Sequence, residues 1–207
     1  MSRPGAQLAL FPDLPPASPR RRGRRTRMFF ALWPPDAVRE ELARVASVVP
    51  PGSAARAHRV KPERFHLTLA FLGEIDKAQA DAAMQAASSV VAAPFDLVFD
   101  TVGHFARAGV AWLGPHELCS GLAQLKAELD RELLRFGLPV ESGAYTPHLT
   151  CLRGVRDAPD ALPFRIDWPV AEFVLVRSVV KAGVSGYEVV RRWPLRREWG
   201  ASRPSGE

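Results

Sequence analysis

Two copies of a short pattern, His-x-Thr, hold the residues of this chain whose types and spacing could do chemistry. They are His66-Leu67-Thr68 and His148-Leu149-Thr150, and each lies in an apolar run typical of a β-strand. Side chains alternate between the two faces of a strand, so each copy predicts an imidazole and a hydroxyl side by side, with the leucine turned into the core. Five histidines and five threonines in 207 residues make even one such pair uncommon by chance, and this chain has two.

Two imidazoles and two hydroxyls around one small anion suit the splitting of a phosphodiester. Histidine titrates near neutral pH, so one ring can take a proton from the attacking oxygen while the other gives one to the leaving oxygen. A threonine hydroxyl beside each ring can hold a phosphoryl oxygen as its negative charge develops. This scheme requires no metal ion or other cofactor. The predicted site therefore consists of His66, Thr68, His148 and Thr150.

Arg153, which follows the second copy, is a candidate cation for the same phosphate. In a regular strand its side chain would point away from the face that carries His148, so a bend after Thr150 is needed for it to reach the site. The equivalent position of the first copy is Phe71, which could pack against a base or fill the core.

Other kinds of site have less support. A zinc ion on His66 and His148 is possible, but no Cys, Asp or Glu stands in a recognisable ligand spacing around either histidine. Cys151 is expected to face the core as a packing residue rather than a nucleophile. The chain has no GxSxG, no P-loop and no GxGxxG, which argues against the common serine hydrolases, P-loop NTPases and Rossmann dehydrogenases. The remaining histidines are expected at the surface or in loops: His58, His104 and His116.

The elements that must position the two motifs alternate between strands and helices. The apolar spacing predicts a strand over residues 28–33, a helix over 37–49, a strand over 65–72 that ends at Gly73, a helix from a cap at Asp76 through 92, strands over 95–105 and 110–113, a helix over 117–136 that ends at Gly137, a strand over 147–152, and a hairpin of 173–181 with 187–193. Each motif strand follows a helix and ends at a glycine (Gly73, Gly154). The hairpins indicate antiparallel pairing, so the predicted fold class is α+β, as one compact domain or two similar lobes.

Charge and composition divide the chain into a tail and a body. Seven arginines and one acid, Asp13, lie in residues 1–27, whereas the rest of the chain is charge-balanced, although the whole has a net charge of +6. Residues 1–27 are rich in Pro, Arg and Gly and are predicted to be disordered; 28–197 form the domain, and 198–207 a flexible tail. No apolar run is long enough to cross a bilayer, no signal segment is present, and the two cysteines form no CxxC. We therefore expect a cytoplasmic protein. We also expect a monomer.

One apolar segment interrupts the N-terminal tail. Gln7-Leu8-Ala9-Leu10-Phe11 resembles the QLxLF-type peptide that docks on the bacterial sliding clamp. A chance apolar patch is the alternative interpretation. As a hypothesis, this segment tethers the protein to a replication or repair assembly, and the nearby arginines add salt-sensitive contacts to nucleic acid.

Three segments together resemble the 2H phosphoesterase superfamily, specifically the bacterial RNA 2′,3′-cyclic phosphodiesterases, historically called 2′-5′ RNA ligases. The segments are residues 28–34 (MFFALWP), 65–73 (FHLTLAFLG) and 145–153 (YTPHLTCLR), and the resemblance covers about residues 28–197. Cys151 departs from the pattern, where the family usually has an aliphatic residue.

The resemblance implies a bilobal α+β fold with pseudo-twofold symmetry, outer helices, and the two motifs facing each other across a central cleft. It implies metal-independent opening of a 2′,3′-cyclic phosphate on RNA or on a nucleotide to a 2′-phosphate. By analogy His66 protonates the leaving 3′ oxygen, His148 activates the water, and Thr68 and Thr150 hold the nonbridging oxygens, although the near symmetry of the motifs leaves the exchange of the two histidine roles open. A binding module without turnover, or 2′-5′ ligation as the reverse reaction, are the alternatives.

Overall fold

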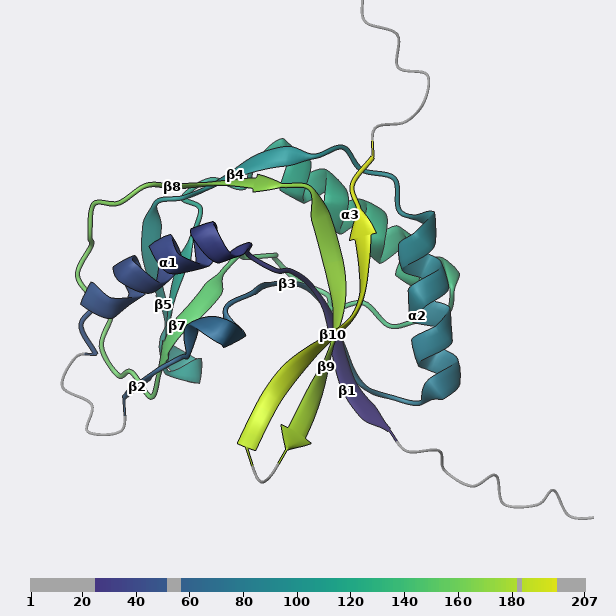
Figure 1. Ribbon diagram of the computed structural model, residues 1–207, viewed down its shortest axis with the longest axis horizontal. Helices are drawn as coiled ribbons and strands as arrows, with labels where there is room; N and C mark the ends of the chain where they lie inside the picture. Colours follow the sequence, from purple (N-terminus) through teal and green to yellow (C-terminus); the bar gives the residue numbers. More distant parts are fainter. Residues whose placement is uncertain (1–24, 52–56, 182–183, 197–207) are drawn as a thin grey trace, which may run out of the picture.

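The structure, a computed structural model, describes residues 25–51, 57–181 and 184–196. These residues form a mixed arrangement of strands and helices (Figure 1). The strands are β1 (Thr26–Leu32), β2 (His58–Arg59), β3 (Leu67–Ile75), β4 (Phe95–Phe99), β5 (Thr101–Phe105), β6 (Val110–Gly114), β7 (Leu149–Arg153), β8 (Ile166–Val170), β9 (Glu172–Lys181) and β10 (Val184–Pro194). The helices are α1 (Asp36–Val48), α2 (Lys77–Ser89) and α3 (Ser120–Arg135), with 3₁₀ turns η1 (Pro62–Arg64) and η2 (Ala106–Ala108).

Two four-stranded sheets each contain one motif strand. The first has the order β10-β9-β1-β3 and the second the order β2-β7-β6-β5, while β4 and β8 form a separate pair. All of these pairings are antiparallel. The α+β class is therefore confirmed, and the predicted closing hairpin is found as β9 and β10.

The two sheets share one apolar core. A single cluster of buried side chains includes Leu67 and Leu69 from the first sheet and Leu149 and Cys151 from the second. The motif residues that alternate with the histidines and threonines thus point inward, as predicted from strand periodicity. A smaller apolar cluster around Phe29 covers the other face of the first sheet. The pseudo-twofold relation between the halves stays a prediction.

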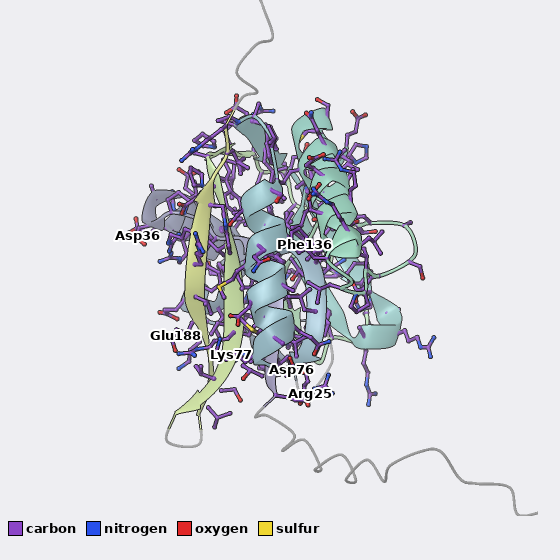
Figure 2. All side chains as sticks on the ribbon, turned by 90° about the vertical axis from the view of Figure 1, so that its right-hand side faces the viewer. Arg25, Asp36, Asp76, Lys77, Phe136 and Glu188 are labelled. Atoms are coloured by element: carbon purple, nitrogen blue, oxygen red, sulfur yellow. The ribbon has the colours of Figure 1, made fainter. Side chains whose placement is uncertain are left out.

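Each helix forms where its sequence supplies an apolar face and a stop. Helix α3 buries four leucines at helical spacing, and Gly137 ends it at φ +74° with backbone bonds from Leu138 to Leu133 and from Gly137 to Leu134. Helix α2 begins at the predicted Asp76 cap, whose carboxylate accepts the backbone N–H of Gln79 in a capping box. Helices α2 and α3 pack together on one side of the molecule and α1 lies on the other (Figure 1); Figure 2 looks onto α2 and α3, with Lys77 at the start of α2.

Two strand predictions were wrong. Residues 95–105 do not form one strand, because the chain leaves β4 at Asp100 and enters β5 in a different sheet. The first motif strand does not end at Gly73 but continues to Ile75. Gly73 has φ +71°, next to a register shift in the β1–β3 pairing, so it accommodates an irregularity inside the ladder. Strands β2 and β8 were not predicted.

The folded part begins earlier than the predicted boundary at residue 28. Strand β1 starts at Thr26, and Arg25 donates two hydrogen bonds to the Glu74 carbonyl near the start of α2 (Figure 2). Arg27 lies 4.7 Å from the centre of the Phe71 ring. Two of the seven arginines assigned to the tail therefore belong to the folded part. The clamp-like segment Gln7–Phe11 and the C-terminal tail predicted over 198–207 lie outside the described residues.

In the described part of the chain, no helix has the length and apolar character needed to span a membrane.

Candidate active site

The two histidines have the same local anchor. The Nδ1 of His66 lies 2.7 Å from the Arg64 carbonyl, and the Nδ1 of His148 lies 2.8 Å from the Thr146 carbonyl, in each case two residues earlier. A carbonyl oxygen only accepts, so each Nδ1 carries the hydrogen. This fixes Nε2 of each ring as the nitrogen that can exchange a proton with a bound molecule.

The two motif strands have the same irregularity. In the β1–β3 pairing Ala31 faces Thr68 and Phe30 faces Ala70, so Leu69 is an extra residue. In the β6–β7 pairing Trp112 faces Thr150 and Ala111 faces Leu152, which leaves Cys151 as the extra residue. Leu69 and Cys151 occupy equivalent positions, one after each threonine. An extra residue of this kind is a β-bulge, which re-aims the side chains that follow it.

The bulge on β7 supplies the bend that Arg153 requires. Cys151 and Leu152 are both buried in succession, and Arg153 then returns to the exposed side with Thr150. Arg153 lines a hollow together with His66 and Thr150. The bulge on β3 acts in the same way on Phe71, which joins the aromatic cluster that contains Phe29.

The four motif residues line three adjoining hollows. The basic hollow, of about 210 Å³, contains His66 and Thr150 with Lys61, Arg64 and Arg153. The loop hollow contains Thr68 and His148 with the segment of residues 140–146. The hairpin hollow contains His66 and Thr68 with residues of β9 and β10. Because the hairpin hollow shares one motif residue with each of the other two, the structure brings all four predicted residues to one concave region.

The two rings differ in their surroundings. His66 packs against Phe29, Trp33 and Tyr187, with ring centres 4.9, 5.9 and 5.1 Å away. Burial lowers the pKa of His66 from 6.5 to about 4, against the opposing effect of its hydrogen bond to the Arg64 carbonyl. The positive charges of His148, Arg153 and Arg64 lower this pKa further. The ligand-free site therefore holds His66 as the neutral imidazole at pH 7.

The surroundings of His148 are less enclosed. Its ring stands nearly perpendicular to that of Phe105, with the ring centres 4.8 Å apart, and its centre lies 6.3 Å from that of Trp112. Tyr145, three residues earlier, donates a hydrogen bond from its hydroxyl to the Thr68 carbonyl at 2.9 Å. Burial raises the pKa of the Tyr145 hydroxyl, so this donor stays protonated. The bond ties the second motif segment directly to the first motif strand.

Several site residues were not predicted. Strand β2 leaves the first half of the chain and pairs with β7 in the second sheet, with His58 opposite Arg153 (Figure 1). This pairing brings the segment after β2, with Lys61 and Arg64, to the site, although the sequence predicts only a polar loop there. The run of basic residues before the first motif was the available signal. For Tyr187 on β10 the sequence has no such signal, because the residues that it contacts are far away in the sequence.

The remaining histidines and cysteines divide between surface and interior. His58 is exposed, as expected, although it lies on strand β2 and also lines the basic hollow. His104 lies on β5, and its buried Nε2 has no hydrogen-bond partner among the described residues, whereas His116 is in an exposed loop as expected. Cys151 is fully buried, and burial raises the pKa of its thiol to about 11. The thiol therefore stays protonated near pH 7, which agrees with the predicted role of Cys151 in packing. Within the described ranges, no three His, Cys, Asp or Glu side chains gather where they could hold a metal ion.

The sequence over most of the chain matches a known family. The profile of the 2′-5′ RNA ligase superfamily matches residues 34–181. The chain belongs to this superfamily.

Individual relatives agree with this assignment over most of their length. The chain is 33% identical to an RNA 2′,3′-cyclic phosphodiesterase of Escherichia coli, over 82% of this chain and 96% of the relative. A protein of the same description from Thermus thermophilus is 31% identical, over 87% of this chain and 96% of the relative. The solved structure of E. coli LigT complexed with 3′-AMP matches with a TM-score of 0.73 and 31% identity, over 84% of this chain and 99% of that one.

Proposed function

We propose that this protein hydrolyses 2′,3′-cyclic phosphate ends of RNA to 2′-phosphates. The observation that carries the proposal is the pair of imidazoles, each anchored through Nδ1 and each with a threonine on the same concave region. Relatives described as RNA 2′,3′-cyclic phosphodiesterases, and the E. coli structures with 3′-AMP and with phosphate, support the same substrate class.

The proposed reaction is an attack of water on the cyclic phosphorus. His148 accepts a proton from the water as its oxygen bonds to phosphorus, and His66 donates a proton to the 3′ oxygen as the bond from phosphorus to that oxygen breaks. The products are a 2′-phosphate and a free 3′-hydroxyl. Thr68 and Thr150 donate to the nonbridging oxygens, and Arg153 balances their charge. No step requires a metal ion or another cofactor.

The donor role of His66 requires a proton that the ligand-free ring does not hold. Its pKa of about 4 keeps the ring neutral near pH 7. A neutral imidazole can act as a base, but a proton donor must be protonated. A bound phosphate is an anion, and a nearby negative charge raises the pKa of an imidazole. We therefore infer that His66 takes up its proton together with the substrate. If it does not, the two histidine roles are exchanged.

One assay tests the proposed function against a binding module without turnover. The full chain is incubated with adenosine 2′,3′-cyclic phosphate and with cyclic-phosphate-ended RNA, in the presence of EDTA, and the products are separated as 2′- and 3′-phosphates. We expect turnover to the 2′-phosphate. Binding of both substrates without product would contradict the proposal, and a 3′-phosphate product would contradict the leaving group assigned here.

A further inference from the structure

The basic hollow has more positive charge than one cyclic phosphate needs. Its lining includes Lys61, Arg64 and Arg153, and the described residues of the lining include no acidic side chain. Among the described residues, none of these three cations forms an ion pair. Unpaired cations that converge on a concave surface attract an anion from outside the protein.

Arg64 is held against an aromatic ring and forms no ion pair with another described residue. Its guanidinium lies 4.9 Å from the centre of the Tyr187 ring, and its buried Nε has no hydrogen-bond partner in the described ranges of the chain. The backbone carbonyl of the same residue anchors His66. A guanidinium that is stacked on an aromatic ring and has no protein acceptor presents its donors in a fixed plane, which suits a phosphate.

The opposite side of the site lacks this property. In the loop hollow, Lys126 is paired with Asp130 and lies 5.3 Å from the Tyr145 ring. Glu141 adds a negative charge to the same lining. Within the part of the chain that the structure describes, positive charge without an ion pair is therefore concentrated on the side of the site that contains His66 and Thr150.

We propose that the basic hollow binds a second phosphate group, the phosphodiester on the 5′ side of the terminal nucleotide of RNA. This inference rests on the proposed function, because it takes the cyclic phosphate to lie among the four motif residues. His66 and Thr150 line the hollow, so it opens directly from that position. The next anion along an RNA strand is the phosphodiester at the 5′ oxygen of the terminal ribose, and a cyclic mononucleotide lacks it.

The consequence is a preference for oligonucleotide ends over cyclic mononucleotides. Contacts to a charged phosphate contribute roughly 10- to 100-fold in kcat/KM when a buried or stacked arginine makes them. Arg64 is the principal contact and Lys61 a weaker one, because Lys61 is exposed and Arg64 is half-buried.

The experiment compares three substrates: adenosine 2′,3′-cyclic phosphate, the ApA dinucleotide with a 2′,3′-cyclic end, and the same dinucleotide with a neutral methylphosphonate in place of its internal phosphodiester. We measure kcat/KM for the wild-type chain, for Arg64→Gln and Lys61→Gln, and for Arg44→Gln as the control. Arg44 is exposed on α1 and lines none of these hollows, so its substitution makes the same change in net charge away from the site.

We expect the dinucleotide to exceed the mononucleotide in wild type by roughly tenfold or more, and the methylphosphonate to lose that advantage. Arg64→Gln should lower the ratio of dinucleotide to mononucleotide kcat/KM strongly and Lys61→Gln weakly, whereas Arg44→Gln should leave it unchanged. A methylphosphonate as good as the phosphodiester, or an equal ratio in Arg64→Gln and Arg44→Gln, would overturn the second phosphate site alone. Absence of hydrolysis of all three substrates by the wild type would instead overturn the proposed function.

Discussion

The His66 half and the His148 half of the site share a local design and differ in their surroundings. Both histidines bond through Nδ1 to the carbonyl two residues earlier, and both motif strands contain a bulge after the threonine. His66 is enclosed by three aromatic rings and lines a hollow with Arg64 and Arg153, while the His148 ring stands nearly perpendicular to the ring of Phe105. Burial lowers the pKa of His66, so in the proposed mechanism the two copies of one motif take opposite proton-transfer roles in different surroundings.

The largest expected effect tests whether both halves are needed for the chemistry. His66→Ala and His148→Ala should each lower kcat on a cyclic mononucleotide by roughly 10²- to 10⁴-fold, the contribution of a positioned acid or base. The double variant should lose much less than the product of the two effects, because the two rings act in one step. His116→Ala, in an exposed loop, is the control. Near-normal turnover in either folded single variant would show that its half is dispensable.

A smaller effect separates the residues that the two bulges re-aim. Arg153→Gln should lower kcat/KM on the cyclic mononucleotide by roughly 10- to 100-fold, because it removes a charge-assisted contact to phosphate. Phe71→Leu, at the equivalent position of the other strand, should have a smaller effect, since it changes the shape of an aromatic cluster and no charge. Equal losses in steady-state kinetics would mean that the bulge on β7 does not place Arg153 at the phosphate.

Proton uptake distinguishes the two rings more finely. Bound sulfate, which does not titrate near neutral pH, should raise the pKa of His66 from about 4. At pH 5.5 the binding of sulfate should therefore be accompanied by the uptake of as much as about one proton per site. Calorimetry in two buffers of different ionisation enthalpy measures this number. His66→Gln should abolish the uptake. Uptake that persists in this variant would assign the bound proton to the other half and exchange the two roles.

The smallest effect concerns the bond that joins the halves. Tyr145→Phe removes the hydroxyl that donates to the Thr68 carbonyl and should cost about 1 kcal/mol of unfolding free energy, or about 2–4 °C in Tm. Tyr187→Phe is the matched control, because its hydroxyl makes no hydrogen bond to another described residue while its ring packs on His66. Thermal unfolding of the two variants should therefore differ, and equal melting temperatures would show that the Tyr145 bond does not stabilise the pair of sheets.

Much of the fold and the four proposed site residues could be predicted from local patterns. The apolar spacing located three helices and most strands, because the period of burial is a property of each segment by itself. The inward position of Leu67 and Leu149 follows from the same alternation. The split of residues 95–105 between two sheets could not be predicted, since both halves have strand character and only their distant partners separate them.

The sequence by itself determined the four proposed site residues and the strands β3 and β7 that contain or directly follow them, because His-x-Thr in extended backbone places both side chains on one face wherever the segment lies. Only the tertiary structure decided what surrounds each ring. The bulge that returns Arg153 to the side of Thr150 depends on pairing with β6, and the arrival of Arg64 depends on β2 joining the second sheet. The neutral state of His66 depends on burial among its aromatic neighbours. These are contacts between segments far apart in the chain, and no local pattern specifies which of them will meet.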